Sequence, residues 1–473
     1  MEYKSLTPEL LEQLRAAVPG RVHTGEDIKP DYSHDEMPIY GQRMPDAVAE
    51  CASTEEVAAV CKICYDNDIP IIPRGAGTGL CGGCVPLYGG VVVDTQKMNQ
   101  ILGYDLDNFT VRAQSGVLLN DLANDCWEKG VFYPPDPGEK FATIGGNVAV
   151  NAGGMRAVKY GATRDYVRAM TVVLPCGEIV RFGGEVSKTS SGYNLLQLMV
   201  GSEGTLGIIT EVSLKVLPQP KQTFSLLVLF PDLDTAISCV PRIKMAGLDP
   251  QALEFLGREM VAGIERYLGK TVYPGKCGGE DVGAYLLTTF ECENEEAMDG
   301  LMEKAAELCL DSGAMDVMVY DTPEAIRSAW AVRGATLEAI LAEFRQTDEC
   351  DVVVPIPNIP EFVNYVVSLE DEIGLAVRAS GHAGDGNVHV NVCANDMDPD
   401  EFLERAEKFM ALAYARGREL GGLISGEHGI GHAKEGYLEE ALGGTVMGLM
   451  RGIKAAFDPK GLLNPGKVCG KVR

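Results

Sequence analysis

The order of apolar and polar positions divides the chain into two regions with different rhythms. From about residue 45 to 217, short runs of β-branched residues alternate with glycine-rich turns, whereas from 220 to 400 longer apolar runs alternate with helical stretches. The runs predict strands at 69–73, 90–94, 109–113, 170–174 and 208–216, and then at 223–230, 284–290, 315–320, 351–355, 376–380 and 388–393. Helices are predicted at 295–313 and 322–344, so the second region is expected to be an α/β domain of its own.

Helical signals also appear outside these runs. Thr7-Pro8-Glu9 places a cap residue and then proline at the first helical position, which predicts a helix that stops by Gly20. Residues 54–67 are amphipathic, and a long amphipathic stretch after Asp400 leads into a glycine-rich segment at 421–431. We find no internal repeat and no low-complexity linker, so the parts are expected to fold against one another.

The charge balance narrows the choice of partner. Acids outnumber bases 68 to 41, and the formal charge of -27 would repel nucleic acid and anionic membrane surfaces. The start of the chain lacks the pattern of an export signal, and no apolar run reaches the roughly 18 to 20 residues needed to span a bilayer. We therefore expect a soluble, cytoplasmic protein of several domains that binds neither nucleic acid nor membrane.

The fourteen cysteines fit a reducing compartment better than a disulfide framework. Cys61-x-x-Cys64 and Cys81-x-x-Cys84 match the spacing of a structural zinc site. Against zinc, Cys61 and Cys64 share one face of the predicted helix at 54–67, where free cysteine usually packs. We favour packed thiols over a zinc site.

A glycine-rich loop at Pro73–Gly82 contains a G-x-G-x-x-G pattern at Gly77, Gly79 and Gly82. A Rossmann loop would have to open a helix, but here more glycines and then the apolar run 91–93 follow, so the loop joins strand to strand. Glycine frees successive amides to converge on an anion, and a cofactor pyrophosphate is the candidate in this acidic protein. A plain surface loop is the alternative.

Small residues and amide side chains recur in four further places. Together with the loop they indicate a backbone that approaches a long, flat, polar molecule. The segments are Pro134–Gly138, Ala142–Asn147, Asn151–Gly154 and Gly201–Gly207.

Four of the six histidines gather in the C-terminal part of the chain. The imidazoles of His382 and His389 and the carboxylate of Glu427 form a donor set suited to zinc, manganese or iron. In the alternating run 388–392, His389 and Asn391 share one face and can enter the same cleft. Adjacent side chains point apart, so Glu427 can ligate a metal while His428 faces a substrate as general base.

These segments resemble the FAD-linked D-2-hydroxyacid dehydrogenases, the glycolate oxidase and D-lactate dehydrogenase branch of the vanillyl-alcohol-oxidase-type flavoproteins. The resemblance runs from about residue 30 to the end and rests on Pro73–Gly79, Lys159–Asp165, Gly201–Glu211, Gly381–His389, Gly426–Gly429 and Asn464-Pro465. The chain is similar in particular to lactate dehydrogenase subunits that work with an electron-transfer flavoprotein in anaerobic bacteria, through Tyr32–Glu36, Asn151–Tyr166 and Asp348–Asp351.

The resemblance implies an α+β fold. Residues 1–218, with a core at about 42–218, would form a PCMH-type FAD-binding domain of two α/β subdomains. Residues 219–415 would form a cap over the substrate, with an antiparallel sheet and helices. Residues 416–473 would pack back on the FAD domain and return to the flavin.

The resemblance also assigns roles to residues. The roles are a divalent metal on His382, His389 and Glu427, a base at His428, and substrate binding by Arg333 and Asn391. The FAD site would comprise Pro73, Arg74, Gly75, Ala76, Gly77, Thr78, Gly79, Asp136, Pro137, Thr143, Gly146, Asn147, Gly153, Gly154, Gly204, Gly207, Ile209 and Asn464.

The implied reaction is oxidation of a D-2-hydroxy acid by hydride transfer to FAD with a metal-assisted histidine base. Near relatives often carry a basic residue just after the proline that matches Pro355, whereas Ile356-Pro357-Asn358 has no charge. This departure favours a monocarboxylate such as D-lactate over D-2-hydroxyglutarate. Glycolate-type oxidation stays an alternative.

The electrons must leave through another molecule, because the sequence has no haem-attachment motif and no ferredoxin-type cysteine run. An electron-transfer flavoprotein is the expected acceptor, with oxygen, a quinone or an iron-sulfur subunit as alternatives. Two other classes stay open: a non-catalytic FAD-binding subunit and a colourless zinc hydrolase. The sequence leaves open the subunit count, a homo-oligomer included, and whether FAD is covalently attached.

Overall fold

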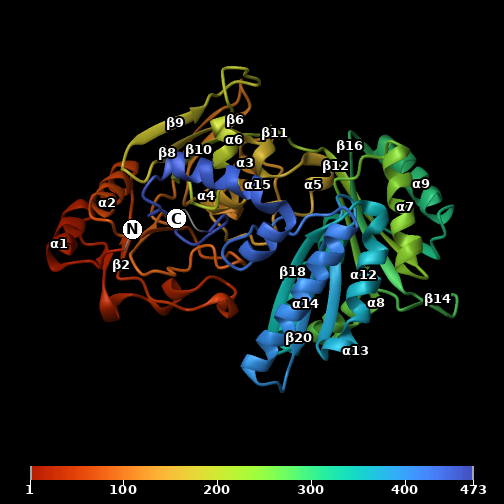
Figure 1. Cartoon of the computed structure of the whole chain (residues 1–473). Coiled ribbons are helices and arrows are strands. Elements are labelled where there is room, and N and C mark those ends of the chain that lie inside the picture. The colour runs from red at the N-terminus through yellow and green to blue at the C-terminus, as the bar shows by residue number, and fades with distance from the viewer. Residues whose placement is uncertain (1–2, 471–473) are drawn as a thin grey trace. The chain divides into compact units, whose positions relative to one another are not determined.

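The computed structural model describes residues 3–470, which divide into two compact units. Of the described residues, unit 1 contains 3–152, 162–219 and 427–470, and unit 2 contains 153–161 and 220–426. Both units combine helices with strands (Figure 1). Among residues 3–470, no helix is both long enough and apolar enough to cross a bilayer.

Unit 1 is built on a four-stranded and a five-stranded sheet. The four-stranded sheet has the order β1-β2-β4-β3, with β2 and β3 both parallel to β4, and the five-stranded sheet β5-β6-β10-β8-β9 is antiparallel. The strands are β1 (Val22–His23), β2 (Ala47–Glu50), β3 (Ile71–Arg74), β4 (Val91–Asp94), β5 (Ile101–Asp105), β6 (Thr110–Gln114), β8 (Val167–Val173), β9 (Ile179–Gly183) and β10 (Ile208–Lys215), with a further pair β7 (Val131–Phe132) and β11 (Leu217–Pro218). The helices are α1 (Pro8–Ala17), α2 (Thr54–Asp66), α3 (Leu119–Glu128), α4 (Ile144–Val150), α6 (Leu195–Met199) and α15 (Glu435–Phe457).

The main core of unit 1 lies between the four-stranded sheet and the helices α1 and α2. The sequence predicted both helices, and Thr7 and Ser53 cap them through side-chain hydrogen bonds to main-chain amides. Cys61 and Cys64 are buried in this core, where burial raises the pKa of both thiols. In the part of the chain that the structure describes, no group of side chains able to hold a metal contains cysteine.

The C-terminal segment completes unit 1. Leu463 is buried in the main core, and its neighbour Asn464 donates its amide hydrogen to the carbonyl of Ile71 in β3. Helix α15 packs beside β9 through the rings of Phe457 and Phe182, 6.4 Å apart, and Figure 1 shows this late helix in blue among the orange and yellow strands of the unit. Unit 1 therefore contains residues from both the early and the late part of the sequence.

Unit 2 contains a seven-stranded antiparallel sheet in the order β17-β12-β16-β13-β19-β20-β18. Helices α7, α9, α12 and α14 cover one face (Figure 1). Helices α8, α10 and α11 pack on the other face. The strands are β12 (Gln222–Phe230), β13 (Ala252–Gly257), β16 (Ala284–Cys292), β17 (Asp316–Tyr320), β18 (Gln346–Val353), β19 (Ala376–His382) and β20 (Asn387–Ala394). The helices are α7 (Leu233–Met245), α8 (Arg258–Leu268), α9 (Glu295–Leu310), α10 (Pro323–Gly334), α11 (Thr336–Glu343), α12 (Ile359–Ser368), α13 (Glu370–Ile373) and α14 (Pro399–Glu419), with α5 (Ala157–Tyr160) from the earlier segment.

Two predicted elements differ from the structure, and several elements of the structure were not predicted. The strand expected at 351–355 is β18, which starts at Gln346, because charged residues at its start conceal the alternation. The helix expected at 322–344 is two helices, α10 and α11, with the break at Ala335 after a glycine. The strand β13 and the helix α15 were not predicted.

The boundaries of the units also differ from the three predicted segments at two places. Residues 153–161 belong to unit 2 because Lys159 and Tyr160 both bind the carboxylate of Glu291, with the Lys159 Nζ to Oε2 distance at 2.8 Å. Residues 416–426 also belong to unit 2, since Leu423 pairs with Val353 at the end of β18. The assignment of the segments to a flavin domain, a cap and a returning segment stays a prediction.

Candidate active site

The glycine-rich loop of unit 1 connects β3 directly to β4. Residues 75–90 contain no helix, as predicted. Gly75 lies against Thr143, the residue that caps α4 with its side chain, and a Cβ at Gly75 would collide with the Thr143 hydroxyl. The structure thus brings the start of the loop beside the segment 143–147.

Two further predicted cofactor residues meet this loop from distant parts of the chain. Gly204 packs on Pro73, where a Cβ would lie 3.0 Å from the proline ring. The side-chain amide of Asn464 donates to the carbonyls of Gly83 and Glu203, at 2.9 Å each. Segments near residues 73, 204 and 464 therefore gather at one place in unit 1.

The structure gives the local surroundings of the other predicted cofactor residues. Gly153 and Gly154 belong to unit 2. Asp136 and Pro137 bind the Lys140 ammonium within their own turn. Gly207 immediately precedes β10, which contains Ile209.

Arg74 is largely buried by its own neighbours in unit 1. Its guanidinium donates to the carbonyl of His34 at 2.7 Å and to the sulfur of Cys84 at 3.0 Å, and it lies over the ring of Tyr32. The positive φ of Gly77 brings its backbone so close that a Cβ would collide with this guanidinium. The Arg74 guanidinium therefore packs against the loop backbone at Gly77 and links it to His34 and Cys84.

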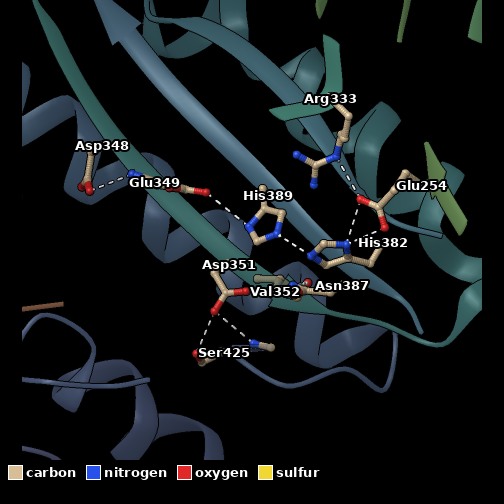
Figure 2. Close-up of polar contacts among 11 residues, drawn as sticks. Glu254, Arg333, Asp348, Glu349, Asp351, Val352, His382, Asn387, His389 and Ser425 are labelled. Carbon is tan, nitrogen blue, oxygen red and sulfur yellow. Dashed lines mark hydrogen bonds and ion pairs between the residues drawn. The ribbon is translucent and has the colours of Figure 1, made fainter. Parts of the chain in front are cut away.

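The polar site of unit 2 lies on one face of four adjacent strands. Cross-strand pairing sets Glu254 of β13 opposite His382 of β19, and it sets Asp351 of β18 opposite His389 of β20. Residues paired in this way point to the same face. Figure 2 shows these side chains in a row that starts at Arg333 of α10 and passes through Glu254 and the two histidines.

Glu254 is completely buried at the centre of this row. His382 Nδ1–H donates to its Oε1 and Oε2 at 2.7 and 2.8 Å, and Arg333 Nε–H donates to Oε2 at 2.9 Å. Burial alone would raise the pKa of Glu254, but the His382 and Arg333 charges and hydrogen bonds outweigh it and hold the pKa below its usual value. The two Glu254 oxygens accept from Nδ1–H of His382, so in the neutral form of this imidazole the Nε2 atom carries the lone pair.

The two imidazoles face each other. Nε2 of His389 lies 3.4 Å from Nε2 of His382, and the rings are nearly perpendicular at 87°. On its other side, Nδ1 of His389 lies 3.2 Å from Oε1 of Glu349, an electrostatic contact rather than a well-directed hydrogen bond. A carboxylate beside each Nδ1 favours the proton there, which directs both Nε2 lone pairs toward each other.

Asp351 fixes the segment that follows the sheet. Its Oδ1 accepts from the side-chain amide of Asn387 at 2.8 Å, and its Oδ2 accepts from the Ser425 hydroxyl at 2.8 Å and from the Gly426 amide at 3.1 Å (Figure 2). A Cβ at Gly426 would collide with Asn387. The chain therefore leaves unit 2 along a fixed path, and Glu427 is the next residue.

The two predicted substrate-binding residues keep free hydrogen-bonding groups. Within residues 3–470, Glu254 is the only partner of the Arg333 guanidinium, and it engages Nε alone. Asn391 is buried on the same face as His389, and within the same residues its side-chain amide makes no hydrogen bond. The terminal amino groups of Arg333 and the amide of Asn391 are therefore available to a ligand.

Glu427 and His428 open the last segment of unit 1. The structure holds Gly426, the residue before them, through its amide hydrogen bond to Asp351. The roles of Glu427 and His428 stay predictions.

Comparisons with known proteins decide the family. Residues 45–183 match the model of an FAD binding domain, and residues 219–468 match the model of the C-terminal domain of FAD linked oxidases. This chain belongs to the FAD-linked oxidase family. The predicted family, the α+β fold and the predicted flavin cofactor are thereby confirmed, and the zinc hydrolase hypothesis is wrong.

Two relatives and one solved structure show how far the likeness extends. The FAD-linked oxidase is 56% identical over 471 residues to the D-lactate dehydrogenase of Anaerostipes hadrus, covering 100% of this chain and 99% of the relative. It is 40% identical over 441 residues to glycolate oxidase subunit GlcD of Bacillus subtilis (strain 168), covering 93% and 92%. The structure of p-cresol methylhydroxylase with substrate bound has a TM-score of 0.79 at 18% identity and covers 99% of each chain, which shows the shared fold.

The residues of unit 1 fit the flavin of this FAD-dependent oxidoreductase. In unit 1, the buried polar atoms that have no hydrogen-bond partner within residues 3–470 include Ser115 Oγ, Tyr133 Oη and Asn464 Oδ1. Ser115 packs on Gly145 at the start of α4, and Asn464 lies beside the loop. Buried orphan polar atoms are rare unless a ligand satisfies them, and the glycine cradle leaves room for one.

Sequence reasoning missed three acids of this FAD-linked oxidase. Glu254 lies in an otherwise apolar strand, and the partners of Glu349 and Asp351 are distant in sequence. One signal was available for Glu254, because an acid within a buried strand needs a cation or donor nearby. The sequence does not identify that partner.

Proposed function

We propose that this FAD-linked oxidase oxidises a D-2-hydroxy monocarboxylate to the 2-oxo acid, and that D-lactate is its substrate. The observation that carries the proposal is the row of side chains in unit 2. The Arg333 guanidinium, with two free amino groups, binds Glu254, and Glu254 binds His382, the first of two facing imidazoles. A relative 56% identical over the whole chain is named a D-lactate dehydrogenase, which supports the same substrate class.

Arg333 is the proposed anchor of the substrate carboxylate. Its planar guanidinium offers two parallel N–H groups, the geometry that a carboxylate accepts with both oxygens. The contact of Nε with Glu254 at 2.9 Å holds the guanidinium in one orientation. The amide of Asn391 supplies a further polar contact.

His382 and His389 are proposed to share a divalent metal with Glu427. With metal–nitrogen bonds of about 2.0–2.1 Å, two corners of a tetrahedral site lie about 3.3 Å apart, and the two Nε2 atoms lie 3.4 Å apart. Glu427 directly follows Gly426, which Asp351 binds at 3.1 Å. This donor set suits zinc, manganese or iron.

His428 is the proposed general base. Oxidation removes the hydroxyl proton and, from C2, a hydride, so the substrate loses two electrons and two hydrogens. His428 would take the hydroxyl proton. Bound FAD supplies the hydride acceptor, and a bound cation makes the hydroxyl more acidic.

The substrate side chain is proposed to be small or apolar. The residues after Pro355 form a short 3-10 turn, Ile356–Asn358, without a charged side chain, and Asn358 donates to the carbonyl of Leu420. This turn follows β18, the strand of Asp351, by two residues. A second substrate carboxylate would find no cation there.

The proposed electron acceptor is an electron-transfer flavoprotein. Support comes from the likeness of residues 32–36, 151–166 and 348–351 to dehydrogenase subunits that use one. Within residues 3–470, none of the fourteen cysteines forms a disulfide, which supports the proposed cytoplasmic location. Anaerobic mixing of the protein, D-lactate and the flavoprotein should bleach the partner's flavin, and a partner that stays oxidised would remove it as acceptor.

An anaerobic screen of D- and L-2-hydroxy acids tests the reaction. We expect D-lactate to reduce the bound flavin faster than glycolate or D-2-hydroxyglutarate, and we expect L-lactate to leave it oxidised. About one divalent metal ion per chain should be measured in the same sample. Faster reduction by D-2-hydroxyglutarate would contradict the proposed substrate.

A variant with His428 replaced by alanine separates an enzyme from a non-catalytic FAD-binding subunit. His428→Ala should retain FAD and lose about 10²- to 10⁴-fold in the rate of flavin reduction. An unchanged rate would remove His428 as the base.

A further inference from the structure

Glu254 is the one charged residue of the strand β13, whose other residues are apolar or glycine. Its side chain is completely buried, opposite Leu287 on one neighbouring strand and His382 on the other. A buried carboxylate destabilises the fold strongly unless hydrogen-bond donors or cations compensate it. Within residues 3–470, His382 and Arg333 provide all of its hydrogen bonds.

The two partners have different proposed tasks. His382 ligates the metal through Nε2 and donates Nδ1–H to Glu254, whereas Arg333 anchors the substrate carboxylate and donates Nε–H to the same Oε2 atom. A carboxylate that accepts from the far nitrogen of a metal-ligating imidazole fixes the tautomer and makes the imidazole a better ligand. The same negative charge offsets the positive charge that Arg333 presents to an anion.

We infer that Glu254 is a positioning residue shared by the metal ligand His382 and the substrate anchor Arg333, and that it strengthens metal binding while it limits the affinity of Arg333 for anions. This inference rests on the proposed function. It predicts that loss of the Glu254 charge weakens binding of the metal but does not weaken binding of the substrate anion. A carboxylate that only fills space in the core would not affect the two ligands in opposite ways.

The chemistry of glutamine makes the inference testable. In Glu254→Gln a single oxygen remains to accept from both partners. If that oxygen binds Arg333, the amide N–H₂ faces Nδ1 of His382, which must then accept, so its proton moves to Nε2 and blocks the metal lone pair. Glu254→Asp is shorter but keeps two accepting oxygens and the charge.

The experiment measures zinc affinity of the FAD-loaded protein by competition with a chelator. We expect affinity in the order wild type, then Glu254→Asp, then Glu254→Gln, with the glutamine variant about 10- to 100-fold weaker than wild type. A packing role predicts the reverse order of the variants, because glutamine preserves the volume and aspartate leaves a cavity. That reverse order would overturn the inference.

The second measurement is binding of pyruvate, the product anion, to metal-depleted protein, followed by the flavin spectrum. Glu254→Gln should bind pyruvate at least as tightly as wild type, since the charge of Arg333 is no longer offset. Weaker pyruvate binding in step with weaker zinc binding would also overturn the inference.

Glu265→Gln is the matched control. Glu265 is a mostly buried carboxylate in the same unit, and it binds Arg258 at 2.8 Å without contacting a histidine. We expect this variant to keep both affinities, and unfolding curves of all three variants check that they fold.

The outcomes also separate the inference from the proposed function. If wild type oxidises D-lactate without binding zinc or another divalent metal, the function stands and the inference fails. If no 2-hydroxy acid reduces the flavin but zinc affinity follows the expected order, the inference about Glu254 stands and the proposed substrate fails.

Discussion

The two units hold their buried polar groups in different ways. In unit 1, buried lysines donate mostly to main-chain carbonyls: Lys454 donates to Thr205 and Leu463, besides the Asp458 side chain, and Lys467 donates to Val85. In unit 2, buried Glu254 is held by other side chains. A carbonyl stays in place when its own side chain is changed, whereas a side-chain partner is lost with its residue. Single substitutions of buried polar residues should therefore change catalytic activity when they lie in unit 2. In unit 1 they should change the free energy of unfolding.

The largest effect is expected at Arg333. Replacement by methionine removes the proposed carboxylate anchor and leaves Glu254 without its cation. We expect kcat/KM for D-lactate to fall at least 10³-fold, about 4 kcal/mol or more. Steady-state kinetics under anaerobic conditions with an artificial acceptor measure it.

Arg258→Met is the control for this prediction. Arg258 also binds a carboxylate and a tyrosine hydroxyl in unit 2, at 2.8 and 3.1 Å. It should keep kcat/KM within a few-fold. Similar losses in both variants would mean that general damage to unit 2, and not loss of the anchor, explains the effect.

The next effect is expected at Lys454. Its ammonium also binds Asp458, which is completely buried, at 2.6 Å. Lys454→Met leaves that carboxylate buried without a cation, so the free energy of unfolding should fall by about 3 to 4 kcal/mol. Urea unfolding followed by release of FAD measures the loss.

Lys460→Met is its control, because Lys460 is more exposed and binds Tyr65 and Asp68 nearer the surface. This change should cost less than about 1 kcal/mol. An equal cost for Lys454→Met would show that the Lys454–Asp458 pair contributes little to unit 1.

The smallest effect is a dependence of stability on pH through Lys467. Burial lowers the pKa of this lysine to about 8, against the opposing effect of nearby acids. The folded pKa is depressed, so between pH 8 and about 10.5 the unfolded chain binds a proton that the folded chain has lost, and stability rises with pH. The rise should reach up to about 3 kcal/mol.

Lys467→Met should lack this rise and should be more stable than wild type below pH 8. Unfolding free energies measured from pH 7 to 10 compare the two. Parallel curves would show that Lys467 titrates normally and that its burial costs little.

Parts of the structure that depend on local pattern could be predicted from the sequence. The alternation in 388–393 placed His389 and Asn391 on one face of β20, and the valines between them are buried on the other. The glycines after Gly79 showed that the loop joins two strands. Both results follow from the spacing of side chains along a short segment.

Features that depend on distant partners could not be predicted. Glu254 has its two partners 128 and 79 residues away. The start of β18 was missed because Asp348 and Glu349 lower the β propensity of a segment whose polar face belongs to the site. The place of 153–161 in unit 2 depends on Glu291, which the local sequence does not reveal.

The return of the last segment to unit 1 determines when each unit can finish folding on the ribosome. Unit 2 has all of its residues once Gly426 has emerged. Unit 1 begins before unit 2, but it lacks Leu463 for its core and the Asn464 bond to Ile71 until the residues after Gly426 have been translated. Unit 1, whose translation starts first, therefore completes its core last. Apolar surface of that core stays exposed while unit 2 folds.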